Sequence, residues 1–327
     1  MPEKLKVVII GPAHPLRGGL ATYNERLARE YLDRGDDAVI YTFRLQYPEW
    51  LFPGKTQYSS EPAPAGIPVK IAINSINPFN WFRTGKEIKK LRPDLVIVKF
   101  WLPFMAPCFG TICRIIRKNR HSRIVSIIDN IIPHEKRLCD RQLAGYWVKS
   151  ADGFIAMSKT VLEDLEKFDK KKPKLFCYHP LYDNFGDPVP KGEAMMRLNL
   201  DPGYRYLLFF GFIRDYKGLD LLLKAFADQR FRNMKLKLLV AGEFYTDPKP
   251  YMDLVRDLDL KDHVIMSSDF IPGSAVRDYF CASDIVVQPY KSATQSGVTQ
   301  IAYHFSKPMI ITGRLRYATL AAGLKTA

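Results

Sequence analysis

Residues 206–226 read YLLFFGFIRDYKGLDLLLKAF, and this stretch decides the fold. Its apolar start is typical of a buried strand over 206–211, and helical spacing predicts a helix over 219–228. Arg214 and Lys217 lie between the two elements. Ligands of parallel α/β sheets bind at the carboxyl ends of strands, so these cations are placed to clamp a diphosphate and to stabilise the charge on a departing phosphate. A charged loop without a ligand is the alternative.

Strand and helix patterns alternate on both sides of this stretch. In the first half, apolar strands are predicted at 5–10, 38–43, 95–100, 123–128 and 153–158, with a helix from about 20 to 34. In the second half, strands at 235–241, 264–267, 284–289 and 308–312 alternate with helices at 250–258, 274–282 and 297–306. Such βαβ series form parallel sheets with right-handed crossovers.

Turn-forming residues separate the two series. Gly, Pro, Asn and Asp gather over 184–204, and a chain of 327 residues exceeds the usual size of a single core. We therefore expect an α/β protein with two Rossmann-like domains, 1–185 and 205–327, joined by a linker over 186–204. The ligand edges of the two domains are expected to face each other across an interdomain cleft.

A glycine-containing loop follows the first predicted strand. Gly18 and Gly19 allow the backbone to approach a ligand closely, and the amides at the start of the next helix attract anions. A tight turn without a ligand is the alternative. The glycine spacing is not GxGxxG, which counts against a nicotinamide-dependent oxidoreductase.

Positive charge is concentrated in the first half of the chain. The formal net charge is +15; residues up to Asp183 hold 30 Lys/Arg and 19 Asp/Glu, which gives +11 and leaves +4 for the remainder. Two basic clusters, 83–92 and 114–123, are either ordinary solvated helix faces or a surface that attracts anionic lipid. Zinc-finger spacing and RNA-binding aromatic signatures are missing from the sequence, so nucleic acid is not an expected partner.

The cysteines and the apolar segments indicate in which cellular compartment the protein is expected. The five cysteines are scattered and include no CxxC pair, which argues against a disulfide framework and a structural zinc site. The apolar run at 5–10 is too short for a secretory signal, and the run at 100–116 is broken by two prolines and an arginine. We expect a cytoplasmic protein, with peripheral attachment to the inner face of the membrane as a further expectation.

Several motifs resemble the GT-B glycosyltransferases, specifically the large retaining family 4 (glycosyl transferases group 1). Residues 209–218 are similar to that family's GxIRxYKG form, and Val240–Tyr245 resembles the strand and loop that come next. Phe270–Pro272 and Ala282–Pro289 resemble the stretch that leads to the sugar site. The resemblance covers essentially the whole chain, and its specific motifs lie within 206–300.

The resemblance implies transfer of a sugar from a nucleotide-diphosphate sugar to an acceptor hydroxyl, with retention, in envelope polysaccharide or glycolipid synthesis. It implies neither a metal nor a cofactor, because Arg214 and Lys217 hold the diphosphate. The acceptor is expected to be a glycan or a lipid-linked intermediate. The implied donor-binding residues are Gly18, Gly19, Gly211, Glu243, Ser292, Ser296, Gly297 and Gln300.

The sequence departs from the family pattern at two positions. The family carries two glutamates eight residues apart where this chain has Ser292 and Gln300. Both side chains still hydrogen-bond to hydroxyl groups, but neither is charged. A non-catalytic nucleotide-sugar-binding protein is therefore the alternative.

The acceptor side is expected after the strand at 123–128. Asp129 stands where the family often has a histidine, and a carboxylate there can hold a sugar hydroxyl or support positive charge at the anomeric carbon. His134 and Glu135 are candidate acceptor contacts; an ordinary helix start after Pro133 is the alternative. Past Thr312 the family pattern continues for some tens of residues, so the second domain is expected to be incomplete.

Overall fold

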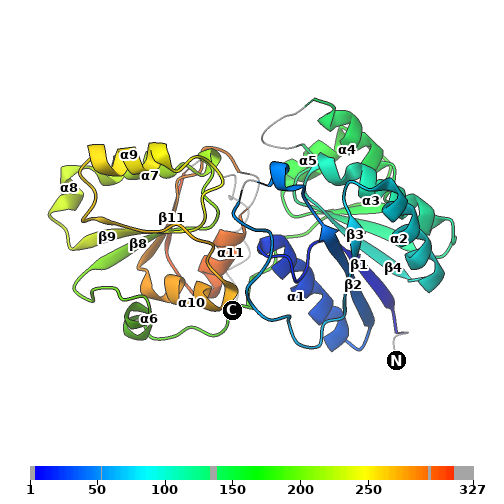
Figure 1. Ribbon diagram of the computed structural model, residues 1–327, viewed down its shortest axis with the longest axis horizontal. Coiled ribbons are helices and arrows are strands. Elements are labelled where there is room, and N and C mark those ends of the chain that lie inside the picture. Colours follow the sequence, from blue (N-terminus) through cyan, green and yellow to red (C-terminus); the bar gives the residue numbers. More distant parts are fainter. Residues whose placement is uncertain (1–3, 53, 133–137, 294–295, 313–327) are drawn as a thin grey trace. The chain divides into compact units, whose positions relative to one another are not determined.

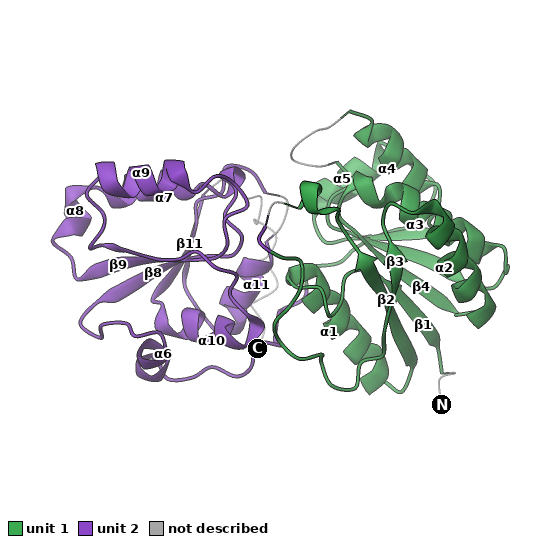
Figure 2. Cartoon of the chain, viewed as in Figure 1, with its two compact units in different colours: residues 1–52, 56–179 green, residues 53–55, 180–327 purple. Residues whose placement is uncertain are grey.

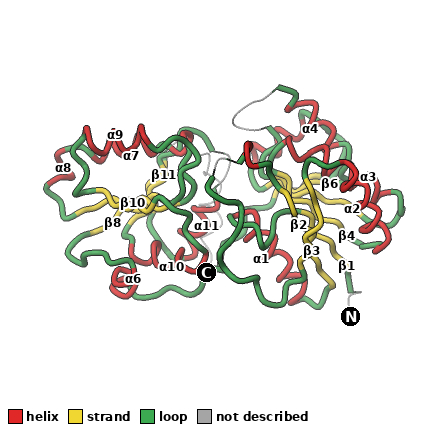
Figure 3. The backbone as a smooth tube through the Cα atoms, viewed as in Figure 1, coloured by secondary structure: helices red, strands yellow, loops and turns green. Residues whose placement is uncertain are grey.

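The computed structural model describes residues 4–52, 54–132, 138–293 and 296–312. The chain divides into two compact units, which Figure 2 draws in different colours. Unit 1 comprises residues 1–52 and 56–179, and unit 2 comprises residues 53–55 and 180–327. Each unit is built around one sheet with helices packed beside it (Figure 3).

The described part of unit 1 forms a parallel sheet with the strand order β3-β2-β1-β4-β5-β6-β7. The strands are β1 (Lys6–Ile10), β2 (Asp37–Leu45), β3 (Val69–Asn74), β4 (Leu95–Phe100), β5 (Arg123–Ile128), β6 (Gly153–Ala156) and β7 (Lys174–Phe176). β1 and β4 are neighbours at the centre and are almost entirely buried. Their continuous apolar runs are typical of parallel strands that are covered on both faces.

The helices of unit 1 cover both faces of its sheet. α1 (Gly19–Asp33) lies on one face, and α2 (Pro78–Leu91), α3 (Ala106–Arg117) and α4 (Asp140–Val148) pack against one another on the other (Figure 1). Right-handed crossovers dictate this division, because the chain runs outward from β1 to β3 and then returns through β4 to β7. α5 (Lys159–Glu166) and two short turns, η1 (Glu49–Leu51) and η2 (Pro103–Met105), complete the unit.

The described part of unit 2 repeats this plan with the strand order β10-β9-β8-β11-β12, again parallel. The strands are β8 (Arg205–Phe210), β9 (Leu236–Ala241), β10 (Val264–Ser267), β11 (Ile285–Gln288) and β12 (Met309–Ile311). The helices are α6 (Lys191–Arg197), α7 (Leu219–Phe226), α8 (Gln229–Arg232), α9 (Lys249–Asp257), α10 (Gly273–Ala282) and α11 (Gly297–His304), with the short turn η3 (Asp215–Lys217) before α7. α7 and α9 pack together on one face, and α10 and α11 lie on the other (Figure 1).

Two parallel α/β sheets confirm the fold class expected from the alternating pattern. The structure adds β3 and β7, two edge strands that the apolar pattern did not single out. Within the range expected as a linker, α6 packs against α10 of unit 2. The facing arrangement of the domains and the interdomain cleft stay predictions.

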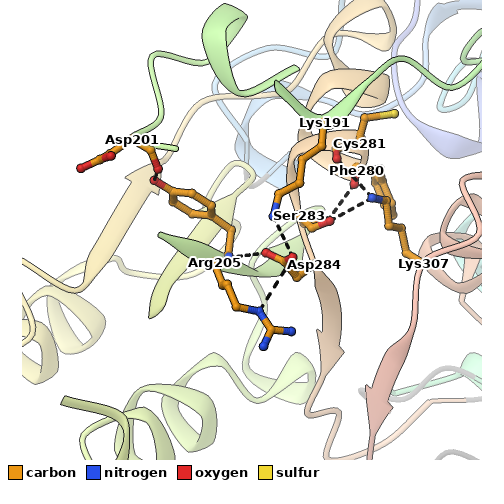
Figure 4. A network of polar contacts seen from close by, with 9 residues as sticks. Lys191, Asp201, Arg205, Phe280, Cys281, Ser283, Asp284 and Lys307 are labelled. Atoms are coloured by element: carbon orange, nitrogen blue, oxygen red, sulfur yellow. Dashed lines mark hydrogen bonds and ion pairs between the residues drawn. The ribbon is translucent and has the colours of Figure 1, made fainter. Parts of the chain in front are cut away.

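A polar network fastens the amino edge of the unit 2 sheet (Figure 4). Asp284, just before β11, accepts hydrogen bonds from Nζ of Lys191 (2.7 Å) on α6 and from the backbone N–H of Tyr206 (2.8 Å) on β8. Nζ of Lys307 donates to the carbonyls of Cys281 (3.1 Å) and Ser283 (2.9 Å) at the end of α10. The network thus joins two helices to the strand starts, away from the edge where ligands bind in such sheets.

No helix within the described residues combines the length and the apolar character that crossing a membrane requires.

Candidate functional site

Each sheet has one point where its strand order reverses. In unit 1 the chain leaves β1 toward β2 on one side, while β4 lies on the other side of β1. In unit 2 the same reversal falls between β8 and β11. Open α/β sheets bind ligands at such switch points, just beyond the carboxyl ends of the two strands. These two points locate one candidate site in each unit.

In unit 2, Gly211 and Lys217 meet at the switch point. Gly211 directly follows β8 and has a φ of +93°, a conformation that favours glycine. The Nζ atom of Lys217 lies 3.0 Å from the point where a Cβ on Gly211 would stand and 5.8 Å from the ring centroid of Tyr290, which follows β11. The ammonium group of Lys217 therefore sits between the ends of β8 and β11.

No carboxylate among the described residues balances the charge of Lys217. Its side chain is buried, and burial together with the positive charge of Arg214 lowers the pKa of Lys217 to about 7. Arg214 is half-buried, and its guanidinium lies 5.1 Å from the ring centroid of Tyr245. Among the described carboxylates, none forms an ion pair with Arg214 or Lys217. The two cations that sequence reasoning singled out thus form a partly buried, net-positive group.

The start of α11 adjoins these cations. Cγ2 of Val298 lies 3.6 Å from the Cβ position of Gly211, so the first turn of α11 faces the end of β8. Ser296 precedes the helix, and its hydroxyl lies 3.4 Å from that of Tyr290. Gly297 lies against the ring of Tyr182, and a Cβ there would stand 2.8 Å from a ring carbon. The amides at a helix start favour an anion, so the structure groups Ser296 and Gly297 with Gly211 and Lys217.

Three aromatic side chains stack beside this site, at the carboxyl edge of unit 2. The ring of Phe212 stacks on that of Tyr245 at 4.2 Å between centroids and faces that of Phe270 at 6.0 Å. All three rings are half-buried. Such a surface suits stacking of a flat ring. The residues come from three separate loops, and sequence reasoning did not single them out as a group.

The remaining predicted donor residues of unit 2 lie in different surroundings. Glu243 is buried, and its carboxylate accepts a hydrogen bond from the backbone N–H of Lys55 (2.5 Å), within the segment 53–55 that groups with unit 2. Ser292 is exposed, whereas Gln300 is buried on α11.

Gln288, at the end of β11, was missed by sequence reasoning. It is almost fully buried and accepts a hydrogen bond from the hydroxyl of Thr299 (2.9 Å), while its Nε2 atom has no hydrogen-bond partner among the described residues. A polar residue at the end of the otherwise apolar DIVVQP run was the available signal.

In unit 1, Lys99 occupies the corresponding switch point. It lies on β4 next to Gly11, whose Cβ position is 3.3 Å from Cβ of Lys99. The side chain of Lys99 is 2% exposed, and its Nζ atom lies 2.8 Å from Oδ1 of Asp129 and 3.6 Å from the ring centroid of Tyr23. Asp129, which sequence reasoning placed on the acceptor side, is therefore one half of a buried ion pair. The signal for Lys99 was a charged residue inside the apolar run LVIVKF.

The other predicted residues of unit 1 fall around this pair or outside the described residues. Gly18 precedes α1 with a φ of +102°, and Gly19 is the first residue of that helix. The loop before them is fixed by hydrogen bonds, including one from the backbone N–H of Ala13 to the Thr42 hydroxyl (2.9 Å). His134 and Glu135 lie outside the described residues.

Family models match both units. Residues 17–177 match the model described as Glycosyltransferase Family 4, and residues 204–321 match the one described as Glycosyl transferases group 1. Among curated proteins, a D-inositol 3-phosphate glycosyltransferase from Kineococcus radiotolerans is 28% identical over 189 residues, 54% of this chain and 43% of that protein. The D-inositol 3-phosphate glycosyltransferase 1 from Catenulispora acidiphila is 26% identical over 55% of this chain and 44% of that protein. The matches therefore span less than half the length of these relatives.

Solved structures share the fold at low sequence identity. Anabaena HepE, solved with UDP and glucose, gives a TM-score of 0.71 at 15% identity, over 95% of this chain and 81% of that chain. WaaG, a glycosyltransferase involved in lipopolysaccharide biosynthesis, gives 0.68 at 16% identity, over 96% and 83%. With one such model matched in each unit and these structural neighbours, the chain belongs to the glycosyltransferases of group 1 and family 4, and its two parallel sheets are those of the GT-B fold.

Proposed function

We propose that this protein transfers a sugar from a nucleotide-diphosphate sugar to an acceptor hydroxyl. The observation that carries the proposal is the pair of cations at the unit 2 switch point, Arg214 and the buried Lys217, which no described carboxylate neutralises. A buried unpaired charge is costly, and a diphosphate offsets it. Structural neighbours that bind UDP or UDP-glucose support the same conclusion.

The donor divides into three parts along the carboxyl edge of unit 2. The diphosphate lies against Arg214, Lys217 and the amides at the start of α11, beside Gly211. The nucleobase stacks on the aromatic group that contains Phe212. The polar positions around these groups, Glu243, Ser292, Ser296, Gly297 and Gln300, contact the nucleoside and the sugar.

In the reaction, the bond between the anomeric carbon and the nucleotide diphosphate breaks as the sugar passes to the acceptor hydroxyl. Arg214 and Lys217 stabilise the negative charge that grows on the departing phosphate, and the configuration of the anomeric carbon is retained. In unit 1, Asp129 faces the acceptor. Gly18 and Gly19, at the start of α1, stay predicted donor contacts. Because the protein's own cations offset the diphosphate charge, turnover requires no metal. Activity should persist in EDTA; a loss that Mg²⁺ or Mn²⁺ restores would contradict this point.

A thermal-shift panel of nucleotide sugars tests the proposed function. A ligand at 100 times its dissociation constant adds roughly 2.7 kcal/mol to the free energy of unfolding, so the correct donor raises the melting temperature clearly. UDP-glucose is the first probe, since a structural neighbour binds it. A panel in which neither free nucleotide diphosphates nor their sugars shift the melting temperature would overturn the proposal.

A non-catalytic nucleotide-sugar-binding protein is the second candidate. Neutral residues at Ser292 and Gln300, where the family pattern has glutamates, favour it, because they leave less negative charge near the anomeric carbon. Release of nucleotide diphosphate from a radiolabelled sugar donor separates the candidates. Binding without release supports the second.

An anionic membrane surface fits one face of unit 1. On α2, Phe79 and Phe82 are 85% and 52% exposed, and the exposed Arg83, Lys86 and Lys90 follow at helical spacing. Aromatic residues beside basic ones suit the interface of an anionic bilayer. The second basic cluster is less available, because Arg117 pairs with Asp152 at 3.1 Å. The acceptor is accordingly a lipid-linked or envelope glycan intermediate.

Liposome sedimentation tests this surface. Binding should require anionic lipid, fall with salt, and weaken when Phe79 and Phe82 are both replaced by Ser. Replacing Arg117, Lys118 and Arg120 together by Gln should weaken it less, since Arg117 is already engaged. Equal partition onto neutral and anionic vesicles, or onto neither, would mean that the acceptor is soluble.

A further inference from the structure

The strand β11 ends in a buried polar side chain that has no part in the proposed contacts with the donor. Gln288 is 1% exposed and is the last residue of a strand that is otherwise apolar. Its Oε1 atom accepts a hydrogen bond from the hydroxyl of Thr299 (2.9 Å), which is 2% exposed on α11. The Nε2 atom of Gln288 has no hydrogen-bond partner among the described residues. A hydrogen bond between two buried side chains therefore joins the end of β11 to α11.

This polar pair is a costly way to join a strand to a helix. The amide nitrogen of Gln288 is desolvated without a partner, which destabilises the folded state. Two apolar side chains of the same shape would avoid that cost, and further along α11 the buried residues include the apolar Ile301 and Ala302. A hydrogen bond is directional, whereas apolar contacts are not. The pair therefore fixes the rotation and the register of α11 on β11.

The register of α11 determines what its first turn contacts. Thr299 contacts Gln288 at the end of β11. The preceding residue, Val298, places its Cγ2 atom 3.6 Å from the Cβ position of Gly211, directly after β8. The Nζ atom of Lys217 lies 3.0 Å from the same point. Because an α-helix has about 3.6 residues per turn, a slip of one residue would rotate these side chains by about 100° and would break both contacts.

The start of α11 can receive an anion. Ser296 occupies the N-cap position, but within the described residues its side chain forms no capping hydrogen bond. Its hydroxyl lies instead 3.4 Å from that of Tyr290. The first amides of α11 are therefore not satisfied by this side chain, and a phosphate oxygen can accept hydrogen bonds from them. The buried ammonium of Lys217 supplies positive charge near this turn.

We infer that Gln288 is a positioning residue for the donor, which through Thr299 holds the start of α11 where the diphosphate meets both its amides and Lys217. The inference rests on the proposed function, because the diphosphate is the ligand proposed for this group. It adds that affinity for the diphosphate depends on a buried pair that itself contacts no ligand. The pair is kept for binding, at a cost in stability.

Stability and binding measured on the same variants test this role. We would compare the parent with Q288M, T299V and the double variant Q288M/T299V, using urea unfolding and calorimetric titration with UDP. Each single variant leaves one buried polar group without its partner, so its urea midpoint should fall. The double variant removes both groups at nearly constant volume, so its midpoint should return at least to that of the parent. UDP affinity should fall about tenfold in all three variants and should not recover in the double variant.

A conservative variant, a second ligand and a matched control separate positioning from structural support. T299S keeps the hydroxyl and should bind UDP within about twofold of the parent. Uridine has no phosphate, so its affinity, measured by NMR titration, should be the same in the parent and in every variant. Y206F removes the Tyr206 hydroxyl, which donates to the carbonyl of Asp201 (3.0 Å) at the amino edge of the sheet; its urea midpoint should fall while its UDP affinity stays unchanged.

The outcomes distinguish this inference from the proposed function. If the double variant recovers UDP affinity together with stability, or if uridine affinity falls in step with UDP affinity, the pair is structural support and the inference is overturned. If the parent binds UDP and T299V binds it equally well, the inference fails while the proposed function stands. If the parent binds no nucleotide diphosphate, both fail. If the double variant does not fold, T299V and T299S carry the test, and equal UDP affinities for these two would overturn the inference.

Discussion

Each unit carries a buried lysine at the point where its strand order reverses, and the two lysines are in opposite electrostatic situations. Lys99 in unit 1 is 2% exposed and is neutralised by Asp129 at 2.8 Å. Lys217 in unit 2 is 9% exposed, pairs with no described carboxylate, and has the cationic Arg214 nearby. A buried lysine at each switch point, on β4 in unit 1 and in η3 after β8 in unit 2, thus lies beside a carboxylate in one unit and beside a second cation in the other.

The difference supports the proposed division of the substrates, with the donor in unit 2 and the acceptor in unit 1. Burying Lys217 beside a second cation, with no carboxylate among the described residues to pair it, costs free energy that a bound anion recovers, so unit 2 is suited to a diphosphate. Unit 1 has already supplied its own anion, and an additional phosphate there would meet the carboxylate of Asp129. On this comparison unit 1 is suited to an uncharged hydroxyl group. The variants below break or sharpen the contrast, from the largest expected effect to the smallest.

Removing both cations from unit 2 should have the largest effect. In R214A/K217A we expect UDP affinity to fall at least about a thousandfold, or roughly 4 kcal/mol, because each lost cation leaves phosphate charge unpaired. K99M should bind UDP within threefold of the parent, since its charge is not part of the donor site. Isothermal titration calorimetry measures both, with circular dichroism to check folding. UDP affinity in the double variant equal to that of the parent would show that the donor site is misplaced.

The protonation of Lys217 makes donor binding depend on pH. In the folded protein without UDP, the pKa of Lys217 is lowered to about 7, so its ammonium group loses its proton above neutrality. UDP affinity should therefore fall by up to about tenfold per pH unit from pH 7 toward pH 9. The free energy of unfolding changes with pH in the opposite direction to UDP affinity. The unfolded lysine has a pKa of about 10.4, so the unfolded chain binds more protons between pH 7 and 10, and the free energy of unfolding gains from Lys217 as pH rises.

The variant K217R isolates this effect. Arginine stays charged over the whole range, so the fall in UDP affinity between pH 7 and 9 should largely disappear even if the affinity itself is lower. Titrations of the parent and K217R at pH 6, 7, 8 and 9 give the comparison. Identical pH profiles for the two proteins would assign the dependence to another group.

Gly211 tests how tightly the unit 2 site is built. A Cβ in G211A would stand 3.0 Å from Nζ of Lys217 and would occupy a residue with a φ of +93°. We expect UDP affinity to fall by about tenfold, together with a loss of about 1–2 kcal/mol in the free energy of unfolding from backbone strain. Gly35 is the matched control, since it has a φ of +89° but nothing within 4 Å of the added atom. G35A should therefore lose stability alone; equal effects on UDP affinity would refute the contact.

The positions of the candidate residues could be predicted from the sequence more fully in unit 2 than in unit 1. Arg214 and Lys217 lie in one continuous strand–loop–helix motif, so their placement follows from local pattern and from the strand-end rule. The aromatic group of Phe212, Tyr245 and Phe270 comes from three loops, and only the pairing of β8, β9 and β10 brings it together. Lys99 and Tyr23 lie on a strand and a helix that periodicity assigned to the core, and the contacts of Lys99 with Asp129 and with Tyr23 depend on which face each element buries.

Hydrophobic periodicity predicted the central strands but not the edge strands of unit 1, because it detects only segments that are buried. Central strands such as β1 and β4 are buried on both faces and read as continuous apolar runs. β3 is half-exposed, and β7 has only three residues, so neither produces such a run.

The smallest effect is expected at the amino edge of the unit 2 sheet, where a variant of Asp284 also serves as a control for the comparison of Lys99 with Lys217. Asp284 is 20% exposed; burial alone would raise its pKa, but hydrogen bonds from Lys191 and from the backbone N–H of Tyr206 lower it. Its stabilisation is therefore present above the unfolded pKa of about 3.9 and is lost as the pH falls through the lower folded value.

The variant D284N keeps the shape but removes the charge. It should lose about 1 kcal/mol at pH 7, because Lys191 is partly solvated and such pairs are worth little, and the difference from the parent should shrink below pH 4. UDP affinity should not change, since this network lies at the strand starts rather than at the strand ends. Urea unfolding at pH 3.5, 5 and 7 with UDP titration at pH 7 measures both quantities, and D257N, at an exposed carboxylate beside Arg256, is the control. A D284N variant that loses UDP affinity would mean that the two edges of the sheet are coupled, and the contrast between the two lysines could then not be assigned to their immediate neighbours alone.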